Sequence, residues 1–479
     1  MSIPGTTQRW LVLLVLMMVM VSGCSFGSAA PQKEAESEAK TEGVIGASEV
    51  VAPADEAAPA APVEVARSEP VAGPDASVAG SGSVEAAPMP TVVMMEADTE
   101  MAAAGDSVES YTVEVQQSEP LRAGEVDDNA QWDDYLLYRR NYQGAPVHDR
   151  DVSERYLIEV KDGQGNPVLG ATVRVFLSGQ PRQEIYSART YANGQVLFQP
   201  LALNMPLDQV DNFVVEVQKE NLLEQFTLTR WNTQVSTTFS ERWTVTLDTQ
   251  ASFDSLNLDV LFLIDATGSM ADEIAKIQST IFDVSARIDA LPGQPNVRYG
   301  LVSYRDRGDA FVSNTYEFTP DVRDFSKNLS TVYADAGGDY PESLNEGLHQ
   351  AVNGVEWRGG DTIQLIFLIA DAPPHLDYAQ DYDYAVEMAN AAQRGIKIFP
   401  IASSGLDDQG EYIFRQLAQY TQGRFIFLTY AGPTNGGAPG DVTTHHVDDY
   451  SVEGLDDLLV SLVEEELAYQ NPHVAQAQQ

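Results

Sequence analysis

Residues 257–468 alternate between apolar runs and amphipathic stretches, and this alternation limits the possible folds more than any other feature of the chain. The run DVLFLID at 259–265 is almost entirely apolar, as in a strand covered on both faces. After it, apolar residues recur at three- and four-residue steps, which indicates an amphipathic helix: Ile274, Ile277, Ile281, Val284, Ile288 and Leu291. Further strand and helix patterns follow in turn. Such units predict an α/β fold, a doubly wound and mainly parallel sheet that binds ligands at the carboxyl ends of its strands.

Residues 153–249 show short alternating segments instead, separated by turn residues. About seven such strands in under a hundred residues predict a β-sandwich that precedes the α/β domain. The pattern DGxGxPVxGAxV at 162–173, followed by TxANG at 190–194, resembles the carboxypeptidase-regulatory or transthyretin-like domains. This resemblance implies a spacer or a binding module, and no catalytic motif stands out in the segment.

The N-terminus indicates a lipoprotein signal peptide at residues 1–23. Arg9 precedes an apolar run that is short for a membrane span and closes on VSGC. This stretch resembles the lipobox of bacterial lipoproteins, which implies cleavage before Cys24 and diacylation of its sulfur. We therefore expect an extracytoplasmic protein anchored by lipid to the cell envelope, and Ser25 favours the outer membrane if the cell has one. The alternatives are an ordinary signal peptide and an uncleaved anchor.

Three further segments lie outside the two predicted domains. Residues 24–105 are rich in Ala, Pro and Glu and almost free of aromatic residues, so they predict a disordered tether. Residues 106–152 are an uncertain connecting segment, in which the aromatic stretch at 132–142 fits either a short helix or an edge strand. Residues 469–479 predict a disordered tail.

Charge and cysteine content exclude several kinds of partner and chemistry. The net charge of −43 repels nucleic acid and anionic lipid headgroups, so we expect neither as a binding partner. An acidic surface favours cations or basic ligands instead. The single cysteine, Cys24, leaves no thiol for catalysis and no disulfide within the chain.

Acidic and hydroxyl side chains gather where the predicted parallel strands end. Asp265 closes one strand and Asp371 another, and buried carboxylates are costly unless they are paired or bind a metal. Thr267 and Ser269 follow in the turn after Asp265, and a glycine-rich turn places Asp339 just before a helix. Hard oxygen donors without His or Cys suit Mg²⁺ or Mn²⁺, with Ca²⁺ as a further option.

This group of residues resembles the metal-ion-dependent adhesion site of von Willebrand factor type A domains. That motif reads Asp-x-Ser-x-Ser, then a distant Thr, then a distant Asp, and the stretch from Asp265 to Ser269 matches its first part with Thr267 in place of a serine. Asp371 matches its last part. Where the family has its threonine, this chain has GGDYPE, so that either Asp339 replaces the ligand or Tyr340 stands there and the ligand is lost. We favour Asp339, which would make a bound ion less electrophilic towards a partner's carboxylate.

Several of these residues also have less specific interpretations. The stretch DATGS would form an ordinary helix cap without any metal. Arg305 and Asp306 either shape the site or form a buried ion pair. His375 follows two prolines, which favours a surface position over a place at the rim of the site. The adjacent His445 and His446 would point to opposite faces of a strand, which argues against a second metal site there.

These patterns predict a binding protein rather than an enzyme. The expected function is metal-dependent adhesion or protein–protein interaction, and an acidic side chain is one group by which the unknown partner would contact the ion. The alternative is an envelope scaffold in which metal only stabilises the fold. A metal-dependent hydrolase is less favoured. The motif DATG carries an alanine that aspartic proteases lack, Thr267 stands where haloacid-dehalogenase phosphatases need Asp, and HExxH, GxSxG and the Walker lysine are absent.

Overall fold

The computed structural model describes residues 120–179, 182–231, 238–250, 256–291, 294–432 and 438–471. All of them belong to one unit. The predicted signal peptide, the lipidation site Cys24, the predicted tether and residues 472–479 of the predicted tail lie outside the described residues. The predicted tail at 469–479 starts too early, because α7 (Leu455–Gln470) includes its first two residues. Among the described residues, no helix combines the length and the apolar character that a membrane crossing requires.

The largest element is an eight-stranded sheet. Its five central strands run parallel, and the strands β11 and β1 that flank them run antiparallel to their neighbours. In spatial order the strands are β11 (Ser313–Thr319), β10 (Asn296–Tyr304), β9 (Asn257–Asp265), β12 (Thr362–Ala370), β13 (Ile396–Ala402), β14 (Phe425–Thr429), β1 (Arg122–Val126) and β15 (Val452–Gly454).

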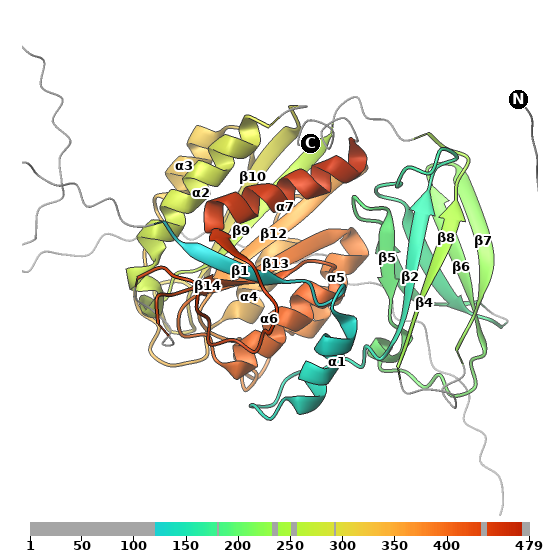
Figure 1. Cartoon of the computed structure of the whole chain (residues 1–479), viewed down its shortest axis with the longest axis horizontal. Helices are drawn as coiled ribbons and strands as arrows, with labels where there is room; N and C mark the ends of the chain where they lie inside the picture. The colour runs from blue at the N-terminus through green and yellow to red at the C-terminus, as the bar shows by residue number, and fades with distance from the viewer. Residues whose placement is uncertain are drawn as a thin grey trace, which may run out of the picture. The chain divides into compact units, whose positions relative to one another are not determined.

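Helices cover both faces of this sheet, as Figure 1 shows. Strand β9 is buried on both sides because its alternate side chains enter two separate cores: Val260 and Phe262 join one, and Leu261 and Leu263 join the other. The first core contains α2 (Ile274–Asp289), α3 (Val322–Leu329) and α7 (Leu455–Gln470), and the second contains α4 (Leu344–His349), α5 (Tyr384–Arg394) and α6 (Asp408–Tyr420). This is the doubly wound α/β arrangement that the strand and helix alternation predicts.

The segment before residue 152 contributes to the same sheet. Strand β1 pairs antiparallel with β14 (Figure 1), although about three hundred residues separate them. The short strand β15 pairs with the other edge of β1. The aromatic stretch at 132–142, for which the sequence fits either a helix or an edge strand, forms the helix α1 (Trp132–Asn141). The α/β unit therefore includes a strand from outside the predicted range 257–468.

Seven strands between residues 154 and 246 form two smaller sheets. One contains β5 (Gln195–Phe198), β2 (Glu154–Lys161) and β8 (Phe239–Thr246); the other contains β4 (Gln183–Arg189), β3 (Thr172–Leu177), β6 (Asn212–Lys219) and β7 (Leu222–Thr229). Side chains from both sheets bury themselves in one shared hydrophobic core, to which Tyr156, Val175 and Phe213 belong. In the sequence, these seven strands are inserted between β1 and β9, which both belong to the large sheet.

Candidate metal centre

Two neighbouring strands deliver the two aspartates that begin and end the predicted motif. Strands β9 and β12 run parallel with Ile264 beside Ile369, so that Asp265 and Asp371 both lie at the carboxyl ends of the parallel strands. Both residues are buried, at 0% and 4% exposure. The parallel pairing thus brings together two carboxylates that are more than a hundred residues apart in the chain.

The turn after β9 fixes one oxygen of Asp265 and leaves the other free. The backbone N–H and the hydroxyl of Thr267 both donate to Asp265 Oδ1, at 2.9 and 2.7 Å. The Thr267 hydroxyl lies 3.2 Å from that of Ser269, and Ser269 lies close enough to Asp371 to oppose the rise in the pKa of that carboxyl. The structure therefore brings four of the predicted site residues together, namely Asp265, Thr267, Ser269 and Asp371.

A third buried carboxylate, Glu342, joins this group, and it was not among the predicted site residues. The backbone of Glu342 pairs with the loop after β12, because its N–H donates to Pro373 O and its carbonyl accepts from His375 N, each at 3.1 Å. Its side chain also lies close to Thr267, and Gly337 packs against both. A side-chain carbon at position 337 would lie only 2.8 Å from Glu342 Oε1 and 2.8 Å from Thr267 Cβ. The only signal in the sequence was a second acid within GGDYPE.

Asp339, the other predicted ligand from this loop, lies in a different group. Its side chain is exposed, and its carboxylate lies near the carboxylate of Asp306 and the imidazole of His375. His375 is only 3% exposed, so the expectation of a surface histidine is wrong. The loop at 336–343 thus directs Glu342, rather than Asp339, towards the buried aspartates.

Burial and nearby negative charges raise the pKa of all three buried carboxyl groups. Burial raises the pKa of Asp265 and of Asp371, and the Asp265 charge adds to the effect on Asp371. Burial, then the charges of Asp265, Asp306 and Asp371, raise the pKa of Glu342 to about 9. Glu273 adds further negative charge near Asp371, but its own oxygens accept hydrogen bonds from Tyr430 and Ser404.

The donor atoms at this centre are oxygens of the type that a divalent cation prefers. Among the described residues, Asp265 Oδ2, Glu342 Oε2 and Asp371 Oδ1 are buried without a hydrogen-bond partner. Buried carboxylate oxygens without a partner are costly, and a cation close to them would offset that cost. In this structure the three carboxylates are not a group whose ligand atoms all lie within 4.8 Å of one another, so they would have to move closer to contact one ion directly. An ion here would be held by these carboxylates and by the hydroxyl of Ser269, a set that suits Mg²⁺ or Mn²⁺.

The elevated pKa of Glu342 predicts a pH-dependent stability. An unfolded glutamate loses its proton near pH 4.5, whereas folded Glu342 keeps it up to about pH 9. Without metal, folding therefore binds a proton in this interval, and the free energy of unfolding falls as pH rises. Chemical unfolding of the wild type and of Glu342→Gln between pH 5 and pH 9 checks this. We expect the stability of the wild type to decline relative to the variant, and parallel curves would contradict the assignment.

Arg305 holds the loops around the centre in place without pairing with Asp306. Its guanidinium is 1% exposed and donates to the carbonyls of Ala266 and Tyr333, at 3.0 and 2.8 Å. Asp306 instead accepts from Ser343 and from Tyr378. The alternative of a buried Arg305–Asp306 ion pair is therefore not what the structure shows.

The two adjacent histidines do not point apart as expected for a strand. The Nδ1 atoms of His445 and His446 lie 3.1 and 3.2 Å from Glu411 Oε2, because the backbone there is irregular. Burial raises the pKa of Glu411, but contacts with His445, then with Arg415 and the backbone of His446, outweigh it and lower the pKa to about 2. Glu411 also lies 3.5 Å from Arg415, which makes the group a structural ion-pair network.

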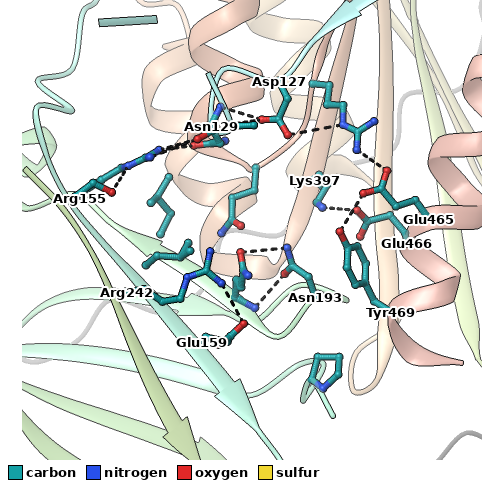
Figure 2. Close-up of a pocket in the computed structure, with 18 of the residues that line it drawn as sticks. Asp127, Asn129, Arg155, Glu159, Asn193, Arg242, Lys397, Glu465, Glu466 and Tyr469 are labelled. Atoms are coloured by element: carbon teal, nitrogen blue, oxygen red, sulfur yellow. Dashed lines mark hydrogen bonds and ion pairs between the residues drawn. The ribbon is translucent and has the colours of Figure 1, made fainter. Parts of the chain in front are cut away.

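A cavity of about 580 Å³ lies elsewhere in the unit, between the smaller sheets and the large one. Figure 2 shows that its charged residues point to one another: Lys397 contacts Glu466, and Arg242 lies 3.3 Å from Glu159. Arg424 similarly contacts Glu125 and Glu465. Because these charges already have partners, the cavity is a weaker candidate for a ligand site than the carboxylate centre.

Comparison with known proteins identifies the domain that carries this centre. Residues 259–430 match the von Willebrand factor A domain, so the chain contains such a domain. Over 121 residues the chain is 31% identical to alpha-protein kinase vwkA of Dictyostelium discoideum; the match covers 25% of this chain but only 19% of that protein. Among solved structures, proximal thread matrix protein 1 from the mussel byssus aligns with a TM-score of 0.25 and 14% identity, over 35% of this chain and 45% of that chain.

Proposed function

We propose that the von Willebrand factor A domain of this chain binds a divalent metal at Asp265, Thr267, Ser269, Asp371 and Glu342 and mediates metal-dependent protein–protein interaction or adhesion. Domains of this family often bind such an ion and suggest interaction or adhesion as the function. The observation that carries the proposal is the set of three buried carboxylate oxygens without a hydrogen-bond partner.

The residues of this centre would have different roles. Asp265 is held by the two hydrogen bonds from Thr267, so its free oxygen is fixed in orientation. Ser269 is exposed and marks the side open to a partner. A bound ion supplies a Lewis-acidic position that accepts an oxygen atom from that partner. With Glu342 as a third carboxylate the ion is more fully neutralised, so the protein surface around Ser269 must contribute to recognition.

The proposal includes the position of the protein in the cell. Lipidation at Cys24 would anchor the chain to the cell envelope on the extracytoplasmic side, and the predicted tether would hold the folded part away from the membrane. The two smaller sheets would form a β-sandwich that acts as a spacer or second binding module. No enzymatic activity is proposed.

A co-purification experiment tests the proposed function. Full-length wild-type protein, Asp371→Asn and the control Asp324→Asn, an exposed residue on α3, are isolated from solubilised membranes with Mg²⁺ or with EDTA. We expect a partner that the wild type and the control retain only with Mg²⁺ and that Asp371→Asn loses. If Mg²⁺ raises the melting temperature but changes no partner, the scaffold function is correct and the proposed one is wrong.

A further inference from the structure

A second group of metal-ligating side chains lies beside the carboxylate centre. Asp306 follows β10, Asp339 lies in the loop at 336–343, and His375 lies in the loop after β12. Each offers one ligand atom, and these atoms all lie within 4.8 Å of one another. Asp306 and His375 are buried, whereas Asp339 is exposed and gives access from solvent.

His375 is positioned as a metal-binding histidine is. Its Nδ1 lies 2.8 Å from Asp377 Oδ1, and its ring stacks on Tyr378 with 3.8 Å between the ring centres. These contacts fix the ring and place the Nδ1 proton towards Asp377, which leaves the Nε2 lone pair available. Nε2 is buried without a hydrogen-bond partner among the described residues, and the nearest acidic oxygen, Asp306 Oδ1, is 3.7 Å away. This gap is too long for a hydrogen bond.

Asp306 has supporting contacts of its own. Ser343 donates to its Oδ1 and Tyr378 donates to its Oδ2, each at 2.8 Å. These bonds orient the carboxylate, and each oxygen keeps a further lone pair for another interaction. Tyr378 thereby supports two members of the group, since it also stacks on His375.

We propose that Asp306, Asp339 and His375 form a second divalent metal site, separate from the carboxylate centre and selective for Zn²⁺. An imidazole nitrogen with two carboxylates suits Zn²⁺, whereas an all-oxygen set suits Mg²⁺. Three protein ligands leave a fourth position for water or for a donor atom from a partner. The loop at 336–343 serves both sites, because Asp339 belongs to this one and Glu342 to the other.

Zn²⁺ binding to the full chain tests this site. With Mg²⁺ in excess to fill the carboxylate centre, equilibrium dialysis counts the Zn²⁺ bound by the wild type, His375→Gln, Asp339→Asn and the control Asp324→Asn. Zn²⁺ held by other groups is common to all four proteins. We expect His375→Gln to lose one equivalent, Asp339→Asn to bind it about 10-fold or more weakly, and the control to match the wild type. Unchanged Zn²⁺ binding by His375→Gln would overturn the proposal.

Two further measurements keep the test independent of folding and of the first site. Asp339 is exposed, so Asp339→Asn should keep the melting temperature of the metal-free protein while losing affinity. Asp371→Asn should still bind the one equivalent of Zn²⁺ although it no longer binds Mg²⁺. If this variant lost the Zn²⁺ equivalent as well, the two sites would not be separate and the proposal would be overturned. Co²⁺ added in place of Zn²⁺ should give the visible absorption of a four-coordinate ion, absent in His375→Gln.

Discussion

Asp371→Asn is expected to abolish the stabilisation that Mg²⁺ gives to the wild type, and to leave the metal-free protein at least as stable as before. The substitution keeps the size of the side chain but removes one of the buried, mutually repelling charges. In the wild type, Mg²⁺ at a hundred times its dissociation constant should stabilise the fold by about 2.7 kcal/mol. Urea unfolding at pH 8 with Mg²⁺ and with EDTA measures both effects.

The control for this prediction is Asp324→Asn, which removes an exposed aspartate of α3 and should respond to Mg²⁺ as the wild type does. A metal-free Asp371→Asn protein that is several kcal/mol less stable would show that the carboxylate is structurally required. Equal stabilisation of variant and wild type by Mg²⁺ would show that the ion binds elsewhere.

Arg415→Met is expected to lower the free energy of unfolding by about 3–5 kcal/mol, since it leaves a buried aspartate without its cation. Arg415 on α6 donates to both oxygens of Asp128, at 3.0 and 2.6 Å, and both residues are buried. Asp128 lies two residues after the end of β1, so this pair attaches the segment that precedes the smaller sheets to α6 of the α/β unit. Urea unfolding of the variant measures the loss.

Strand β1 also offers a matched control for the buried pair. Arg122 lies 2.7 Å from Asp441, but these side chains are 39% and 71% exposed. Arg122→Met should therefore cost no more than about 1 kcal/mol. The double variant Asp128→Asn with Arg415→Met should recover part of the loss, because the buried charge of Asp128 is then removed as well. A cost for Arg415→Met as small as that for Arg122→Met would mean that the N-terminal segment does not stabilise the unit.

The strands and helices with strong periodicity could be predicted from the sequence, and the weakly patterned ones could not. Strands β9 and β12 are continuous apolar runs, and α2 repeats its apolar residues over 16 positions. By contrast, β11 is only partly buried, and β1 has five residues, RAGEV. The place of β1 in the sheet depends on pairing with a strand about three hundred residues away, which no local pattern encodes.

The candidate site divides in the same way. Asp265 and Asp371 could be placed together because parallel strands end at one edge of the sheet. The positions of Glu342 and Asp339 depend instead on how the loop at 336–343 pairs with Pro373 and His375, a contact between two irregular segments. His375 is likewise buried, with its ring stacked on Tyr378, and no local pattern around it predicts this position.

A crystal structure of the full chain grown with Mn²⁺ tests the central claim most directly, because the anomalous signal of manganese locates the ion. We predict an anomalous peak in contact with Asp265, Asp371 and the hydroxyl of Ser269, and its absence in crystals of Asp371→Asn. The account would be contradicted by wild-type crystals that show no peak at this position. In that case protons and water would satisfy the carboxyl groups of Asp265, Asp371 and Glu342 instead.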